Sequence, residues 1–156
     1  MSIKDQFIPH LIVSDGKAAI EFYERVFGGE AGHIMLAPDG KRVMHGEIVL
    51  DGHKLFVSDE FTEQEGGTCR MPQSLGGTCV RITLQTEEAD AIVQRAVASG
   101  AKVIMPLQDM FWGARYGKIR DPFGHEWGIN QQLLELTSEQ EEAAAQKFFA
   151  SRKSER

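Results

Sequence analysis

Two segments of this chain repeat one another at a fixed spacing of 72 residues. Asp15 matches Glu87, and Gly52-His53 matches Gly124-His125. Each copy is about 50 residues long, which suits one supersecondary unit rather than a domain. Two such units cannot each cover a sheet face alone. We therefore expect them to pack together around a shared cavity in which a ligand binds.

Each copy has the pattern of a strand, a helix and three further strands. In the first copy Asp15 caps the expected helix and Gly28 ends it, and in the second Gly100 ends the helix of Glu87–Ser99. β-branched and apolar runs between turn signals predict the strands. They are Phe7–Val13, Glu30–Leu36, Val43–Leu50 and His53–Ser58, then Thr78–Leu84, Val103–Leu107, Trp112–Ile119 and His125–Asn130. The predicted fold class is α+β, with two tandem βαβββ modules.

The predicted domain boundaries follow from this repeat. The first module takes residues 1–60 and the second takes residues 78–136, with a polar, Gly-rich linker or flap loop at 61–77. Residues 137–156 are expected to form a C-terminal helix and tail, and two overlapping capping boxes mark the helix start. Phe148 and Phe149 on this helix need burial, on this chain or on a partner chain.

Charge and composition narrow the classes of partner. The chain has 156 residues, a net charge of −6 and a pI near 5.4, which argues against binding to nucleic acid or to an anionic membrane surface. No apolar run approaches the roughly 20 residues that a membrane helix needs. Cys69 and Cys79 are expected to be free thiols, and no leader segment is evident, so we expect a cytoplasmic protein.

Three polar side chains are expected on one face of the first module. His45 and Glu47 alternate with apolar residues on one strand, and His10 has the parity that faces the same side of its own strand. As a metal-free pair, His45 and Glu47 are the candidate catalytic residues, with a carboxylate or imidazole acting as general base. The three together form an alternative metal site of two histidines and one carboxylate. A hydrogen-bonded polar pocket that recognises a ligand without catalysis is the other interpretation, and it is favoured over the metal site.

The second module offers candidate ligand-binding residues. Trp112, Arg115 and Tyr116 form an aromatic and cationic group that suits a planar, anionic ligand, although dimer or core packing would use the same residues. Strand alternation allows only one of Arg115 and Tyr116 to face the cavity unless a bulge intervenes. Arg81, inside an apolar strand, either binds an anion or pairs with an acid such as Glu47. Asn130 completes the set of ligand-binding candidates, which also includes His10.

Two motifs carry a resemblance to a known family. Asp121-Pro-Phe-Gly-His125 and Trp112-Gly-x-Arg115-Tyr-Gly117, together with the two βαβββ copies, resemble the vicinal oxygen chelate superfamily. This superfamily contains glyoxalases, bleomycin-resistance proteins and ring-cleaving dioxygenases, and the motifs are most similar to its PhnB-like branch. The resemblance implies a curved, half-barrel mixed sheet around a central cavity, and a homodimer.

The chain departs from the metalloenzymes of that family. There an acidic ligand follows the Asp of the Asp-Pro-x-Gly turn by seven residues, and here that position is Gly128. The equivalent position of the first copy is Phe56, and the first-strand positions fall on Ile8 and on Cys79 or Val80. Zinc, nickel and iron sites need three or four N, O or S ligands. We therefore expect no metal cofactor, with a divalent metal at His10, His45 and Glu47 as the alternative.

The expected function is binding of a small organic molecule in the cavity between the modules, without the family's standard metal site. Whether the protein is an enzyme stays open at this point. A catalyst would be a lyase, isomerase or dioxygenase of the vicinal oxygen chelate type. One alternative is a metal-dependent glyoxalase- or dioxygenase-like enzyme, and another is a resistance-type protein that sequesters a drug.

Overall fold

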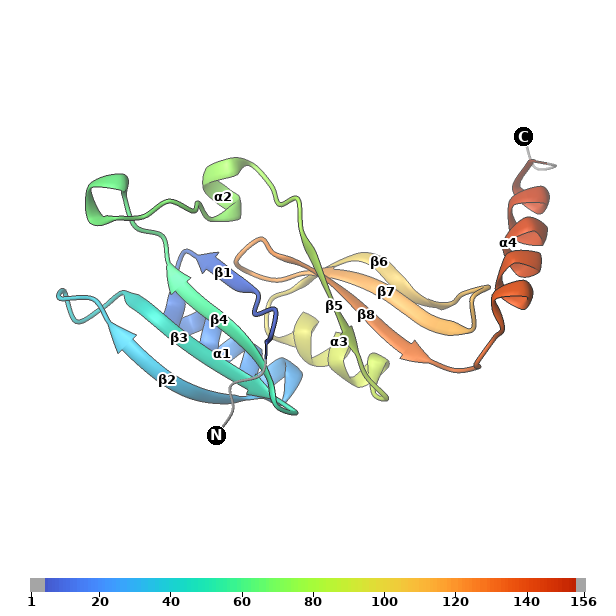
Figure 1. The fold of residues 1–156 in the computed structure, drawn as a ribbon, viewed down its shortest axis with the longest axis horizontal. Coiled ribbons are helices and arrows are strands. Elements are labelled where there is room, and N and C mark those ends of the chain that lie inside the picture. The colour runs from blue at the N-terminus through green and yellow to red at the C-terminus, as the bar shows by residue number, and fades with distance from the viewer. Residues whose placement is uncertain (1–4, 154–156) are drawn as a thin grey trace.

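The structure is a computed structural model that describes residues 5–153, and it has the predicted two modules (Figure 1). Each module runs strand, helix, strand, strand, strand, so the predicted fold class is confirmed. The first module consists of β1 (His10–Val13), α1 (Gly16–Phe27), β2 (Glu30–Leu36), β3 (Val43–Leu50) and β4 (His53–Asp59). The second consists of β5 (Arg81–Gln85), α3 (Ala89–Ala98), β6 (Lys102–Asp109), β7 (Ala114–Arg120) and β8 (Glu126–Gln132).

The two modules share one strand order. Sheet A has the order β1-β4-β3-β2, and sheet B has the corresponding order β5-β8-β7-β6. In each sheet the first and last strands of the module pair in parallel, and the other neighbours pair antiparallel. The architecture is therefore two four-stranded mixed sheets, related by the sequence repeat.

Several element boundaries differ from the predicted ones. The first strand begins at His10, because Pro9 has no N–H for a ladder and Phe7 is fully exposed. The seventh strand begins at Ala114, because a turn at Gly113 with φ of 83° precedes it. Within the segment 61–77, predicted as a linker or mobile flap, the chain forms the 3-10 turn η1 (Glu63–Glu65) and the short helix α2 (Pro72–Leu75).

The C-terminal helix α4 spans Ser138–Lys153, within the predicted segment 137–156. Thr137 and Gln140 exchange backbone-to-side-chain hydrogen bonds of 2.9 and 3.2 Å, so the earlier of the two capping boxes begins the helix. Figure 1 shows α4 extending from the end of sheet B, far from the first module. Phe148 packs on Phe111 with ring centroids 5.0 Å apart, whereas Phe149 is 57% exposed. Among residues 5–153, no helix has the length and apolarity that crossing a membrane requires.

The helices lie on one side of the sheets and join the two modules. α1 packs on β3 and β4, α3 packs on β6 and β8, and α1 also contacts α3. The buried apolar residues of both modules form one continuous cluster, which includes Tyr23, Val57, Ile119 and Ile129. We call the opposite sides of the two sheets the open faces. The segment after β4 lies over one end of the open face of sheet A.

A buried carboxylate links the two modules inside this core. The Asp121 Oδ2 atom accepts hydrogen bonds from the Tyr23 hydroxyl at 2.6 Å and from the Trp127 indole N–H at 2.9 Å. Its Oδ1 atom accepts the backbone N–H groups of Phe123 and His125. Burial, followed by the Asp121 charge, raises the pKa of Tyr23 well above its ordinary value, so Tyr23 stays a donor.

Tyr23→Phe tests this link between the modules. Losing a hydrogen bond to a buried carboxylate is expected to lower the free energy of unfolding by about 1.5–3 kcal/mol. Urea denaturation followed by tryptophan fluorescence measures it. Tyr116→Phe is the matched control, because Tyr116 is half-exposed, and it should cost under about 0.5 kcal/mol. Equal losses in the two variants would contradict the role of the Tyr23–Asp121 bond.

Candidate functional site

A cavity of about 700 Å³ lies at the end of sheet A, beneath the segment that follows β4. Its wall is partly apolar, from residues such as Ile12, Met44 and Phe61, and partly polar. The complete lining is His10, Ile12, Ala37, Pro38, Asp39, Arg42, Met44, Ser58, Asp59, Phe61, Glu65, Gly66, Gly67, Thr68 and Cys69. Every lining residue belongs to the first module or to the segment after it, and none comes from the second module.

Arg42 attaches the segment after β4 to the β2–β3 turn. Its guanidinium donates to Asp39 at 2.7 Å and to Glu65 at 2.7 and 3.3 Å, and it lies 4.5 Å from the centre of the Phe61 ring. The bonds from Arg42, with further bonds from Thr62, lower the pKa of Glu65 to about 2. Arg42 is therefore paired with two carboxylates at this end of the cavity, and the group keeps a net negative charge.

Glu60 fixes the other end of the same segment. Its carboxylate accepts hydrogen bonds from the Arg70 guanidinium, from the Met71 backbone N–H at 3.2 Å and from the Ser74 hydroxyl at 2.8 Å. The Ser74 and Arg70 side chains lower the pKa of Glu60. The segment predicted as a linker or flap therefore forms a wall of the cavity. It is attached through Arg42 to the β2–β3 turn and through Glu60 to α2.

Asp59 forms part of the cavity floor and is 7% exposed. Its Oδ2 atom accepts the backbone N–H of Gly16 at 3.1 Å and that of Val43 at 2.7 Å. These bonds attach the start of α1 and the start of β3 to the end of β4. A Cβ on Gly16 would lie 2.6 Å from the Cβ of Val43, so glycine is required for this close approach.

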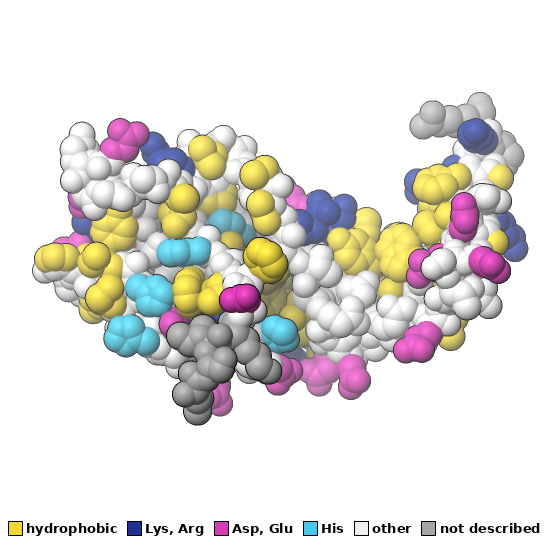
Figure 2. All heavy atoms as spheres, viewed as in Figure 1, with side chains coloured by type: hydrophobic (Ala, Val, Ile, Leu, Met, Phe, Trp, Pro, Cys, Tyr) yellow, Lys and Arg dark blue, Asp and Glu magenta, His cyan; other side chains and the backbone are white. Residues whose placement is uncertain are grey.

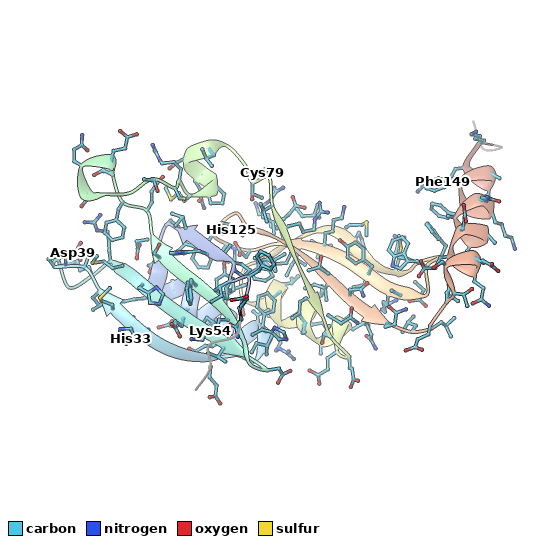
Figure 3. All side chains as sticks on the ribbon, in the orientation of Figure 1. His33, Asp39, Lys54, Cys79, His125 and Phe149 are labelled. Carbon is cyan, nitrogen blue, oxygen red and sulfur yellow. The ribbon has the colours of Figure 1, made fainter. Side chains whose placement is uncertain are left out.

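The open face of sheet A carries a row of aromatic and imidazole rings. The Phe56 ring lies 5.9 Å from the His10 ring and 4.6 Å from the His45 ring, and His33 on β2 lies 6.4 Å from His45. His10 Nε2 is 3.1 Å from the Ser58 hydroxyl. Figure 2 shows histidine side chains gathered on this face of the first module, and Figure 3 labels His33 and Lys54 at its rim.

His45 and Glu47 lie together, as the strand alternation predicts. His45 Nε2 is 3.3 Å from Glu47 Oε1, and Lys54 Nζ donates to Glu47 Oε2 at 3.2 Å. These two partners lower the pKa of Glu47, with the bond to His45 contributing most. A stabilised carboxylate is a weaker base. His10 sits on the far side of Phe56 from this pair.

The residues present do not fit the family's standard metal. Phe56 pairs with His10 across the parallel β1–β4 ladder, and Gly128 pairs with Thr83 across β5–β8. The described part of the chain contains no group of three or more His, Cys, Asp or Glu side chains arranged to hold a metal ion. His10, His45 and Glu47, the alternative metal set, are not gathered around one point.

Tyr116 occupies the space beside Gly128. A Cβ at position 128 would lie 2.7 Å from the Tyr116 hydroxyl and 2.8 Å from the Thr83 hydroxyl. Both distances are far below van der Waals contact. Glycine at 128 thus leaves room for a phenol at the position where the metalloenzymes carry an acidic ligand.

The other candidates of the second module lie on both sides of sheet B. On the open face, Arg81 pairs with Glu126 at 2.9 Å rather than with Glu47, and Asn130 donates to Gln85 at 2.6 Å. Arg115 faces the helix side, where it pairs with Asp90 of α3 at 2.8 Å.

The remaining two aromatic candidates continue a chain of ring contacts. Trp112 contacts Phe111 at 5.0 Å and Tyr116 at 6.0 Å. Alternation allows only one of Arg115 and Tyr116 on the open face, and it is Tyr116, because its hydroxyl lies beside Gly128 while Arg115 pairs with Asp90 of α3. These second-module residues do not line the 700 Å³ cavity of the single chain.

Comparison with known proteins places the chain in a family. A sequence model of the Glyoxalase/Bleomycin resistance protein/Dioxygenase superfamily matches residues 5–129. The chain belongs to this superfamily. An uncharacterized protein of Mycobacterium bovis, Mb0911c, is 38% identical over 145 residues, which cover 92% of this chain and 94% of the relative. An uncharacterized protein of Arabidopsis thaliana, At5g48480, is 30% identical and covers 80% of this chain and 76% of its own length.

Solved structures of similar proteins have the same fold as this chain. The protein PA1353 of Pseudomonas aeruginosa superposes with a TM-score of 0.67 at 25% identity, over 83% of this chain and 98% of that one. TioX from Micromonospora sp. ML1 superposes with a TM-score of 0.63 at 27% identity, over 84% of this chain and all of the other.

Sequence analysis missed several residues of the cavity. Arg42, Asp59, Phe61 and Ser58 were not candidates, because their roles depend on the segment after β4 folding back over sheet A. One signal was present for Ser58. It has the strand parity of Phe56 on β4, two residues further on, and therefore shares the open face with His10.

Gly128→Ala tests the contact with Tyr116. The added methyl group is expected to displace the phenol and to cost about 1–3 kcal/mol of unfolding free energy, measured by urea denaturation. In a Tyr116→Ala background the same change should cost clearly less, because one of the two crowding groups is gone. A cost that does not depend on Tyr116 would contradict this packing.

Proposed function

We propose that this superfamily member binds a small organic molecule in the cavity of sheet A, and that binding needs no divalent metal. The observation that carries the proposal is an ordered cavity of about 700 Å³, which lies within the usual size of ligand sites. The wall that covers it is attached at both ends, by Arg42 and by Glu60. The ligand site was expected between the modules, and this proposal puts it in the first module and the segment that follows it.

The charges around the cavity support an uncharged, mainly apolar ligand. Arg42 uses its guanidinium on Asp39 and Glu65, and the Asp59 Oδ2 atom accepts two backbone N–H groups. A charged ligand would have to compete with these existing partners, of which Arg42, Asp39 and Glu65 are 35–38% exposed at their side chains. Ile12, Met44 and Phe61 supply apolar contact area, and His10, Ser58 and Thr68 supply hydrogen-bonding groups.

We further propose that the protein is a homodimer and belongs to the PhnB-like branch. The branch assignment rests on the motif from Trp112 to Gly117. The dimer is supported by the two open faces, which cannot meet within one chain because the helices join the modules on the other side. In a two-fold pair, sheet B of one copy would cover sheet A of the other. Tyr116, Arg81 and Asn130 of one copy would then reach the ligand of its partner.

A cavity-filling pair of variants tests the binding site. Met44 lines the cavity and Met35 does not, and both are 46% exposed on sheet A. We expect uncharged aromatic molecules from a fragment library to raise the melting temperature of the wild type and of Met35→Trp, but not of Met44→Trp. Thermal shift after extraction with a chelator measures it and tests the metal independence. Ligands that act equally on Met44→Trp, or only after a metal is added, would refute the proposal.

The oligomeric state is the second test. Light scattering coupled to size exclusion should give twice the chain mass of 17.4 kDa. Lys118 is the register partner of Gly128 and so lies on the open face of sheet B. Lys118→Glu reverses the charge at that place and should shift the mass toward that of one chain. Lys17→Glu on α1 is the control. A wild-type mass of one chain at about 100 μM would contradict the dimer.

A further inference from the structure

His10 and Ser58 form a hydrogen-bonded pair on the cavity wall. Ser58 is 5% exposed, and its hydroxyl lies 3.1 Å from His10 Nε2. A serine hydroxyl both donates and accepts, so it can hold a neutral imidazole and can also accept the N–H of an imidazolium. The pair lies at the point where β1 and β4 run in parallel, so two adjacent strands fix its geometry.

The other charged groups near the cavity are engaged by groups of opposite charge or by backbone N–H groups, and the free thiol of Cys69 also lines the cavity. Asp39 and Glu65 are paired with Arg42, and Asp59 accepts two backbone N–H groups. Glu47, one strand further from the cavity, is held by His45 and Lys54. His10 differs from all of these in having a neutral hydrogen-bond partner, so it keeps its capacity to gain a proton.

The surroundings of His10 favour its neutral form near pH 7. Burial lowers the pKa of His10 below its ordinary value, and the nearby His45 imidazole on β3 lowers it further. Asp59 on β4 accepts the backbone N–H groups at the starts of α1 and β3, and Arg42 pairs with both Asp39 and Glu65. Phe56, the remaining neighbour, is apolar.

We propose that the His10–Ser58 pair is a proton-transfer site that acts on an uncharged, planar carbon acid bound in the cavity. This inference rests on the proposed function, because it needs a ligand in that cavity. In the step, the C–H bond of the substrate breaks, its electron pair stays with the substrate, and the proton bonds to His10. Nε2 keeps its hydrogen on the Ser58 oxygen while Nδ1 takes the proton. Return of the proton to another atom of the substrate makes the reaction an isomerisation.

5-Nitrobenzisoxazole is a suitable probe, because it is uncharged, planar and small enough for the cavity. Removal of its C3 proton by a base breaks the N–O bond and gives 2-cyano-4-nitrophenol in one step, with no other reactant. Ionisation of this product to its coloured phenolate gives the readout. We expect turnover by the wild type above that of free imidazole at the same concentration. The rate should level off at pH values above the lowered pKa of His10 and fall below it, because only the neutral imidazole accepts a proton.

Three variants assign the base. His10→Gln keeps a hydrogen-bonding group beside Ser58 and should lower the rate roughly 10²-fold, the usual contribution of a general base. Ser58→Ala should shift the pH profile to a lower pKa, because the imidazolium loses its acceptor; Ser58 is thus a positioning residue. His53→Gln, at the exposed start of β4, is the matched control and should leave the rate unchanged. Unfolding midpoints show whether each variant is folded.

Each outcome decides between the two proposals. Loss of turnover in Glu47→Gln but not in His10→Gln would overturn the inference and return the role of base to Glu47. A probe that raises the melting temperature without turnover would also overturn it, while leaving small-molecule binding intact. A probe that neither binds nor reacts would count against the binding site itself. If His10→Gln fails to fold, the pH profiles of the wild type and Ser58→Ala still decide.

Discussion

One buried carboxylate, that of Asp121, links the two modules of this molecule. Asp121 accepts four hydrogen bonds, two from the turn that follows it and two from aromatic side chains that belong to different modules, Tyr23 and Trp127. A buried charge is tolerated only when its oxygens are satisfied in this way. The Asp-Pro-x-Gly turn is therefore more than a turn signal. It places an acceptor where helix α1 of the first module presents the Tyr23 donor, and this attaches α1 to the turn between β7 and β8.

Joining the modules through their helices has a consequence for the sheets. Since α1 and α3 share one core, the open faces of sheets A and B lie on the outside of a single chain. His125, labelled in Figure 3, strengthens the same junction, because its Nε2 atom lies 2.9 Å from the carbonyl oxygen of Ile12 on β1. Ile12 also lines the cavity. The junction of the modules thus supports the strand that carries His10, although the second module contributes no residue to the cavity.

Much of the fold could be predicted from the sequence, because period and turn chemistry are local. The 72-residue repeat gives the two modules, and strand alternation correctly separates Arg115 from Tyr116 and groups His45 with Glu47. The partners of individual side chains were harder to predict from the sequence, because they depend on distances between strands. Glu47 was one predicted partner of Arg81, but Arg81 pairs with Glu126, its direct neighbour on β8. The cavity wall could not be predicted, because a Gly-rich segment shows no period and its position depends on Arg42 and Glu60.

The substitution at the family's metal corner and the chemistry of the cavity have one explanation. A metal site needs carboxylates and imidazoles gathered around one point. In this fold that requires ligands on β4 and β8 as well as on the first strand of each module. Here Phe56 and Gly128 replace those donors, and Phe56 places an apolar ring between His10 and His45. That ring separates an imidazole whose hydrogen-bond partner is neutral from one that is bound to a carboxylate. The loss of the metal donors therefore leaves two histidines with different hydrogen-bond partners, and the one beside Ser58 faces the cavity.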